Sequence, residues 1–270
     1  MNTEIMHKGD KMSDILLNVN SLSAGYGERN VIEDIDFSIS RGEIVCVVGE
    51  SGSGKSTLLK TICGFENVYI NSGSVSFKGQ QISDLNPKKR RALMGNGIGI
   101  IPQNPAGSFN PLRRFDAQFK ETFLSHRMPY EESRILDIFE KVGLSGGKEI
   151  LRSRPYEMSG GMNQRIAIAA AMLLEPELLL CDEATSALDV TTASAIVDLL
   201  CDYRDEKNVG ILMVTHNLGI ARKMADYTGI MQNGRFIEYG SRDEIFTSPK
   251  MEYTKRLIED VPKLAGVVNG

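Results

Sequence analysis

The sequence predicts an α/β fold with a mainly parallel central sheet. Three short segments, residues 44–48, 178–181 and 211–215, consist almost entirely of apolar residues, which is typical of strands buried on both faces. A segment that we expect to be helical follows each of them. Buried strands that alternate with helices indicate a parallel sheet covered by helices.

The composition is that of a soluble globular chain. The 270 residues correspond to about 1.8 domains of roughly 150 residues each, so one large domain or two small ones are expected. Hydrophobic residues make up 41% and charged residues 24%, which excludes disorder. The net charge of −4 argues against a dedicated nucleic-acid or polyanion binder. We interpret the basic run Lys88-Lys89-Arg90-Arg91 as a solvated helical face.

The cysteines indicate a reduced compartment. They are scattered, with no Cys-x-x-Cys pair, so we expect buried reduced thiols of a cytosolic protein rather than a metal site. They are Cys46, Cys63, Cys181 and Cys201. No stretch approaches the roughly 20 apolar residues that cross a bilayer. Residues 1–14 are polar without an apolar signal core, and we expect a flexible tail there and a chain neither exported nor inserted by itself.

The first third of the chain is expected to contain strands and one helix. Residues 15–39 are strand-like, with short apolar runs that turn-forming residues interrupt. After the strand at 44–48, the glycine-rich turn 49–54 precedes a helix over 55–65, which Gly64 closes. Residues 75–82 are expected to form another short strand.

The middle and the end of the chain continue the alternation. A strand is expected at 98–101, then a helical insertion at about 105–165, in which residues 130–142 are amphipathic, and a helix over 166–174. The helix after 178–181 has an apolar stripe formed by Ile196, Leu199, Leu200 and Tyr203. Asn217 is a plausible N-cap after the strand 211–215, and Asn233-Gly234 predicts a hairpin turn.

The turn after the first buried strand fits the P-loop pattern G-x-x-x-x-G-K-[ST]. Glycines let successive backbone N–H groups point at an anion, and the following helix adds its positive dipole end. Lys55 can reach the β- and γ-phosphates of a nucleotide, and the Ser56 hydroxyl can bind Mg²⁺. The expected phosphate-binding residues are Gly49, Glu50, Ser51, Gly52, Ser53, Gly54, Lys55, Ser56 and Thr57.

Two acidic residues end the second buried strand. Asp182 and Glu183 lie where a parallel strand meets the ligand crevice. We expect Asp182 to hold Mg²⁺ through its water shell and Glu183 to polarise an attacking water. The alternative is an exposed acidic pair without a function, which the P-loop in the same chain disfavours.

The segment Met158-Ser159-Gly160-Gly161-Met162-Asn163-Gln164-Arg165 resembles the signature motif of ABC ATPases. The other landmarks of that family follow in order, namely the P-loop, Gln103, Ser186-Ala187-Leu188-Asp189 and His216. The resemblance covers residues 15–262 and leaves 263–270 as a tail. It implies a P-loop NTPase of the ABC ATPase fold, with an antiparallel N-terminal β region and a helical subdomain inserted at about 105–165.

The resemblance also implies roles for single residues. ABC ATPases pair head to tail around two ATP molecules with Mg²⁺, so Ser159, Gly160 and Gly161 would face the partner's γ-phosphate. Glu183, His216, Gln103 and Lys55 would be catalytic, with His216 sensing the γ-phosphate and Gln103 contacting Mg²⁺ or water. Tyr26 would stack on adenine, or be an ordinary strand aromatic. Asp189 would communicate between the two sites, or be a simple helix N-cap.

One branch of the family is the most similar. The signature has Met162 where many members have Gln, which is similar to the first ATPase subunit of dipeptide, oligopeptide and nickel importers. The segments 103–111 and 248–262 also look like that branch. Since no Cys follows Cys201, we expect no iron–sulfur cluster, and a nickel or metallophore cargo is nearly as plausible as a peptide.

The branch implies partners and a location. They are a related second ATPase subunit in a heterodimer, two transmembrane permease subunits and an extracytoplasmic substrate-binding protein, with no nucleic acid. The chain would lie peripherally on the cytoplasmic face of the membrane. Two alternatives are a soluble ABC ATPase outside transport and a regulatory module that binds ATP without hydrolysing it.

Overall fold

The computed structural model describes residues 14–259. The tails expected at 1–14 and 263–270 therefore lie outside the described residues, except for Asp14. Within the described part, no helix has both the length and the apolar character needed to span a bilayer.

The central sheet has six strands in the order β10-β9-β3-β8-β7-β6. They are β3 (Ile44–Val48), β6 (Ile98–Ile101), β7 (Leu178–Asp182), β8 (Gly210–Thr215), β9 (Tyr227–Gln232) and β10 (Arg235–Ser241). Five strands run parallel, and β10 pairs antiparallel with β9 across the predicted Asn233-Gly234 turn. The predicted parallel sheet and hairpin are confirmed.

A second, antiparallel sheet has the order β2-β1-β4-β5. Its strands are β1 (Ile15–Tyr26), β2 (Arg29–Ser40), β4 (Tyr69–Phe77) and β5 (Gln80–Gln81). The expectation of one strand over 75–82 was wrong. The strand begins earlier, at Tyr69, and a turn with positive φ at Lys78 and Gly79 then reverses the chain into β5.

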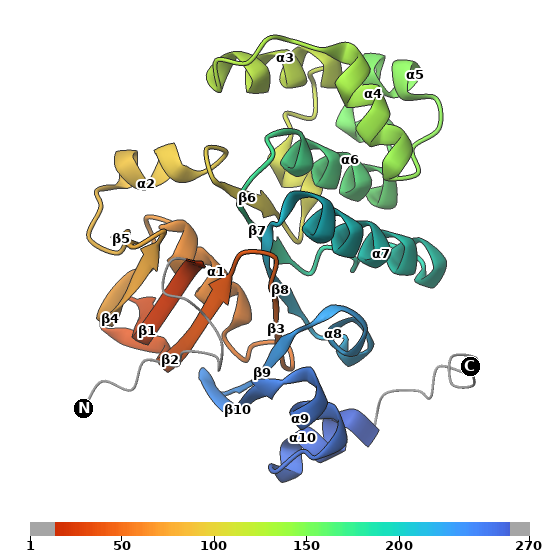
Figure 1. The fold of residues 1–270 in the computed structure, drawn as a ribbon. Helices are drawn as coiled ribbons and strands as arrows, with labels where there is room; N and C mark the ends of the chain where they lie inside the picture. The colour runs from red at the N-terminus through yellow and green to blue at the C-terminus, as the bar shows by residue number, and fades with distance from the viewer. Residues whose placement is uncertain (1–13, 260–270) are drawn as a thin grey trace.

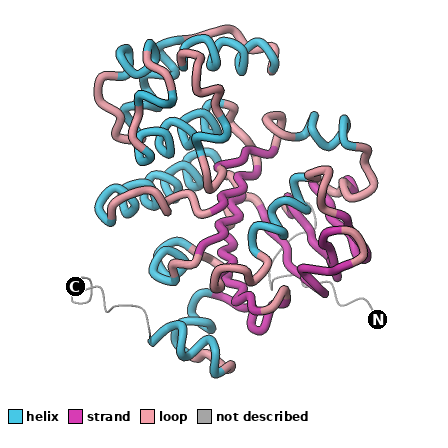
Figure 2. The backbone as a smooth tube through the Cα atoms, turned by 180° about the vertical axis from the view of Figure 1, so that it is seen from behind, coloured by secondary structure: helices cyan, strands magenta, loops and turns pink. Residues whose placement is uncertain are grey.

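Helices cover both faces of the central sheet (Figures 1 and 2). Helix α1 (Lys55–Cys63) lies between the two sheets, and α6 (Gly160–Leu173), α7 (Val190–Lys207) and α8 (Leu218–Met224) lie on the opposite face. Strand β3 contributes side chains to the cores on both faces of the central sheet. Ile44, Cys46 and Val48 join the core under α6–α8, while Val45 and Val47 join the core under α1. This alternation is the period-2 geometry of a strand.

The expected helical insertion contains several short elements. They are η1 (Pro105–Ser108), α3 (Phe115–Ser125), α4 (Glu132–Lys141), α5 (Gly147–Arg152) and η2 (Pro155–Glu157), which lead into α6. Aromatic rings form its core, with edge-to-face pairs between Phe109 and Phe115 and between Phe119 and Phe139. Helix α6 (Gly160–Leu173) begins before the helix expected over 166–174, because Ser159 caps it.

The remaining elements are short. Helix α2 (Pro87–Leu93) precedes β6, and α9 (Arg242–Thr247) and α10 (Glu252–Glu259) end the described chain. In α2, Lys88 and Lys89 are exposed as expected, but Arg90 is not part of a solvated face. Its guanidinium donates to the carbonyl oxygens of Ile82, at 2.6 Å, and of Ser83, so it docks α2 onto the preceding segment.

The cysteines match the expectation of buried thiols. Cys46, Cys63 and Cys181 are buried and Cys201 is half-buried, and all four are free. Burial raises the pKa of Cys63 to about 12 and also raises that of Cys46. Neutral, buried thiols behave as small apolar side chains. Within residues 14–259 no cluster of His, Cys, Asp and Glu could hold a metal ion by itself.

Glu177 connects the two sheets at the edge opposite the P-loop. Its carboxylate accepts a hydrogen bond from Lys78 at 2.8 Å and one from Arg41, and its backbone bonds to Gly97 and Gly210. Burial alone would raise its pKa, but the two cations outweigh burial and hold the pKa below the ordinary 4.5. The charged Glu177 carboxylate therefore stabilises the fold at pH values above 4.5. This contribution is lost as the pH falls through the lowered pKa.

We expect Glu177→Gln to lower the free energy of unfolding at pH 7 by about 1 kcal/mol, the upper end for partly exposed ion pairs. The difference should shrink at acidic pH, as the pH falls through the lowered pKa and the wild-type carboxylate becomes protonated. Urea unfolding followed by circular dichroism at both pH values measures it. Glu121→Gln is the control, because that carboxylate is 60% exposed in its pair with Arg113. Equal unfolding free energies for Glu177→Gln and wild type at pH 7 would contradict this role.

Candidate functional site

The P-loop is shaped by close backbone approaches. It connects β3 to α1, and Gly52 and Gly54 have φ values of 82° and 110°, which side chains rarely adopt. A Cβ at Gly49 would lie 2.2 Å from the carbonyl oxygen of Met231. Only glycine therefore fits at the start of the loop, and the loop rests against the end of β9.

Lys55 lies at the centre of this loop. Its ammonium group donates to the carbonyl oxygens of Gly49 and Glu50, both at 2.7 Å, and its side chain is buried. Burial lowers the pKa of Lys55, while the nearby carboxylates of Glu183, Asp182 and Glu50 oppose that shift. A buried cation whose hydrogen bonds go to neutral carbonyl and hydroxyl oxygens is well prepared to exchange them for phosphate oxygens.

Ser56 and Asp182 meet across the crevice. The Ser56 hydroxyl donates to the Asp182 carboxylate at 3.2 Å, although 126 residues separate the two in the chain. Burial raises the pKa of Asp182, and the Ser56 hydrogen bond partly offsets this. A hydroxyl and a partly desolvated carboxylate are the hard oxygen donors that suit Mg²⁺, which keeps several waters of its own. The predicted metal-binding residues thus fit that ion.

Glu183 lies at the centre of a second set of contacts. Its carboxylate accepts a hydrogen bond from Gln103 Nε2 at 3.0 Å and contacts His216 Nδ1 at 3.1 Å. Its backbone has a φ of 48°, in the left-handed region, and its N–H bonds to Val214. A non-glycine residue there is strained, and such strain gathers at functional positions.

The order of the strands explains why these side chains lie close together. Strands β3, β8, β7 and β6 are neighbours and run parallel, so their carboxyl ends lie at the same edge of the sheet. The P-loop follows β3, His216 follows β8, Asp182 ends β7 with Glu183 next, and Gln103 follows β6. This edge is where ligands bind in open α/β sheets.

The signature segment lies at the start of α6. The Ser159 hydroxyl accepts a hydrogen bond from the Met162 N–H at 3.2 Å as the N-cap, and Ser159 and Gly160 are exposed. A Cβ at Gly161 would lie 3.4 Å from the Ala187 carbonyl oxygen, so this segment adjoins the one at 186–189. In the described part, the hydrogen bonds of Ser159 and Gly161 do not reach the P-loop.

The other two predicted ligands have different outcomes. Tyr26 is 43% exposed at the end of β1, so its ring is accessible. Asp189 is the N-cap of α7, where its carboxylate accepts from Thr192 N at 3.0 Å and from the Thr192 hydroxyl at 2.7 Å. The alternative of an N-cap for Asp189 is therefore confirmed, and both ATP-site roles stay predictions.

Sequence reasoning missed three supports of the site. The Gly234 N–H donates to the Ser53 carbonyl oxygen at 2.9 Å, so the tip of the β9–β10 hairpin holds the P-loop. Tyr253 of α10 lies near Glu50, and burial, together with that carboxylate, raises the pKa of its phenol. The third support is Gln164, which is fully buried behind the signature segment. The Asn-Gly pair signalled the hairpin but not its contact.

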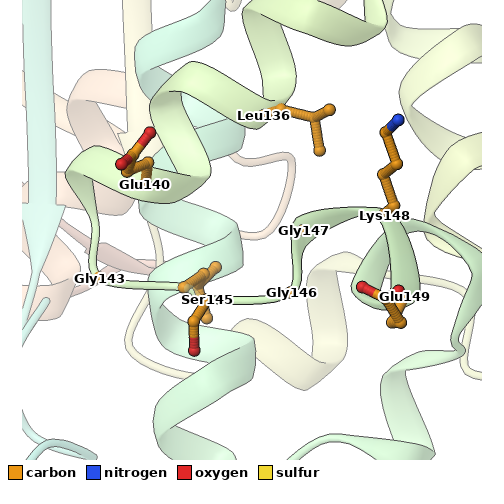
Figure 3. A pocket seen from close by; sticks show the side chains of 9 residues that line it. Leu136, Glu140, Gly143, Ser145, Gly146, Gly147, Lys148 and Glu149 are labelled. Atoms are coloured by element: carbon orange, nitrogen blue, oxygen red, sulfur yellow. The ribbon is translucent and has the colours of Figure 1, made fainter.

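Two cavities differ in their relation to the site. One, of about 530 Å³, lies at the turn between α4 and α5, beside Glu140, Lys148 and Glu149, and Figure 3 shows it lined by the glycine-rich loop 143–147. None of the predicted site residues lines it. The other, of about 420 Å³, is lined by Glu183 and His216 among other residues. The chemistry of the side chains, rather than cavity size, therefore locates the site.

A comparison with family models decides the assignment. Residues 32–186, more than half of the chain, match the family described as ABC transporter. The chain belongs to the ABC transporter family. The predicted ABC ATPase fold is confirmed with it, because a solved ATP-binding subunit of an ABC transporter is 31% identical and superposes with a TM-score of 0.74, covering 85% of this chain and 91% of that one.

Curated relatives in the ABC transporter family carry the names of peptide transport subunits. The oligopeptide transport ATP-binding protein OppD of Lactococcus lactis subsp. cremoris (strain SK11) is 37% identical, over 87% of this chain and 71% of the relative. The dipeptide transport ATP-binding protein DppD of Lactococcus lactis subsp. cremoris (strain MG1363) is 34% identical, over 90% and 71%. The prediction of an ATP-binding, ATP-hydrolysing ABC transporter subunit is thereby confirmed.

Proposed function

We propose that this ABC ATPase hydrolyses Mg·ATP at the edge formed by β3, β8, β7 and β6, and powers the import of peptides. The observation that carries the proposal is the set of hydrogen bonds that joins Gln103, Glu183 and His216 beside the P-loop. Three side chains from three neighbouring strand ends converge where the γ-phosphate of a P-loop nucleotide would lie.

The residues of this chain divide the work. The P-loop N–H groups and the start of α1 bind the phosphates, and Lys55 gives up its carbonyl contacts to pair with them. Ser56 and Asp182, with Gln103 nearby, would hold Mg²⁺, which supplies charge neutralisation on the phosphates when bound. Tyr26, exposed at the end of β1, would stack on the adenine.

Glu183 orients and polarises the attacking water. Gln103 and His216 fix the direction of its carboxylate, and the strained backbone fixes its position. Because Glu183 accepts the His216 contact through its carboxylate, His216 Nδ1 carries a proton, and its Nε2 is left for the γ-phosphate or water. Such preorganisation lowers the barrier without reorganisation at the moment of reaction.

A second ATPase subunit would complete the site. The exposed Ser159 and Gly160 at the start of α6 offer N–H groups of a capped helix, which suit a γ-phosphate on a facing subunit. Asp189 lies at the start of α7, and we propose that it links the two sites. We propose a related but different chain as the partner.

The names of the relatives support the proposed cargo. Their names concern oligopeptide and dipeptide transport, and we infer a peptide cargo in place of nickel or a metallophore. Two permease subunits and an extracytoplasmic binding protein would complete the importer. The chain would lie peripherally on the cytoplasmic side of the membrane, without contact to nucleic acid.

A deletion strain tests the proposal. We expect loss of uptake of a radiolabelled oligopeptide, restored by the wild-type gene but not by Glu183→Gln, with ⁶³Ni²⁺ uptake unchanged. Loss of Ni²⁺ uptake with normal peptide uptake would reassign the cargo. Normal uptake of both, with ATP hydrolysis by the purified chain, would favour a soluble ABC ATPase instead.

A further inference from the structure

Helix α6 contains two consecutive buried amides. Asn163 and Gln164 are 5% and 0% exposed, so neither reaches solvent. Asn163 Nδ2 donates to the carbonyl oxygen of Pro155 at 2.9 Å and lies 3.4 Å from that of Met158. It thereby ties the segment before the signature to the helix.

Gln164 connects the same helix to a different segment. Its Nε2 donates to the carbonyl oxygen of Pro102 at 3.4 Å, across 62 residues of sequence. Pro102 directly precedes Gln103, whose own amide donates to Glu183. The contacts therefore run without a break from His216 through Glu183, Gln103 and the Pro102 carbonyl to Gln164.

The far oxygen of Gln164 is unusual. Gln164 Oε1 is buried and has no hydrogen-bond partner in the structure. Leaving a buried acceptor unpaired costs free energy, whereas an apolar side chain of the same shape would avoid that cost. Turning the amide over would set Oε1 against the Pro102 carbonyl oxygen, which repels it. Packing alone thus gives no reason for a glutamine at this position.

We propose that Gln164 is a positioning residue that moves the start of α6 with the Gln103 loop when Mg·ATP contacts Gln103 and Glu183. In this proposal the Gln164 side chain has two positions. The structure shows the first, in which its bond to the Pro102 carbonyl is long and its Oε1 is unpaired. In the second, Oε1 accepts a hydrogen bond. The link rests on the proposed function, because ATP must be what moves Gln103. It passes the state of this chain's site to the segment 159–161.

The variant Gln164→Met tests the link, because methionine fills a similar volume without polar atoms. In the complex purified through a tag on this chain, we expect an unchanged or higher Tm, an ATP Kd within twofold of wild type, and ATP hydrolysis at least tenfold slower. Thr228→Val is the matched control. The Thr228 hydroxyl is also buried and unpaired, but it lies in β9, so its removal should leave hydrolysis unchanged.

Hydrogen–deuterium exchange gives a readout that does not need turnover. On adding Mg·ATP to wild type, exchange should change together in residues 98–103 and 160–165; in Gln164→Met it should change only in 98–103. Coupled changes in both proteins, or wild-type hydrolysis by Gln164→Met, would overturn the link. A lower Tm with a proportional loss of activity would show a merely structural residue. Binding without hydrolysis in wild type would overturn the proposed function, while the exchange result would still decide the link.

Discussion

Glu183→Gln should lower the rate of ATP hydrolysis by about 10²–10⁴-fold, the range for removal of a positioned general base. A glutamine carbonyl still accepts the hydrogen bond from Gln103, and its NH2 group can donate to His216 Nδ1 once the imidazole changes tautomer, so the site should keep its shape. The negative charge that polarises the water is lost. ATP affinity should therefore stay within a few-fold of wild type, because neither the P-loop nor Ser56 is altered.

Steady-state phosphate release and titration with a fluorescent ATP analogue separate the two effects. Glu140→Gln is the matched control, since this carboxylate is exposed on α4, away from the site. It should hydrolyse ATP like wild type. Equal turnover in Glu183→Gln and wild type would remove Glu183 from the reaction. An equal loss of affinity and of turnover would show that Glu183 only supports the shape of the site.

Lys55→Ala should weaken ATP binding itself, by about 10–100-fold. A hydrogen bond to a charged group contributes about 1.5–3 kcal/mol, and the Lys55 ammonium is the buried cation of the P-loop. In the free protein its hydrogen bonds stay within the loop, to the carbonyls of Gly49 and Glu50 and the Ser53 hydroxyl, so its loss should change the fold little. Turnover at saturating ATP should fall as well, because the charge on the γ-phosphate is less neutralised.

Titration with fluorescent ATP measures this loss, and circular dichroism verifies the fold. Lys148→Ala, which removes an exposed lysine beside the cavity between α4 and α5, is the control and should bind like wild type. An affinity for Lys55→Ala equal to that of wild type would exclude the predicted phosphate contact.

Local patterns in the sequence predicted the elements that position the site. The apolar run 44–48 and the glycines after it predicted β3 and the P-loop, because burial and positive φ act on neighbouring residues. The Asn217 cap was predicted for the same reason and is confirmed by bonds to the N–H groups of Gly219 and Ile220. These features need no knowledge of distant contacts.

Other features depend on residues far apart in the chain. The hydrogen bond from Ser56 to Asp182 follows only once the order β3-β8-β7-β6 is known. The basic run predicted a solvated Arg90, but its guanidinium donates to the Ile82 carbonyl oxygen instead. A guanidinium can donate to backbone acceptors as well as to water. Nothing in the sequence indicated that Gln164 is buried, because a single polar residue in a helix is ordinarily solvated.

The strain at Glu183 could not be predicted from its residue type either. Acidic residues at strand ends are common, and the contacts of Gln103 and His216 distinguish this one. The sequence pattern gave the candidates, and the tertiary contacts show which of them meet. That Lys55, Ser56, Asp182 and Glu183 share one edge is the basis of the proposed chemistry.

Isothermal titration calorimetry with Mg·ATP tests the binding of the triphosphate most directly. The folded Glu183→Gln protein, mixed with its second ATPase subunit, should give a saturable heat of binding that EDTA weakens and Lys55→Ala largely removes. Absence of any binding heat from the folded mixture at millimolar Mg·ATP would contradict the account.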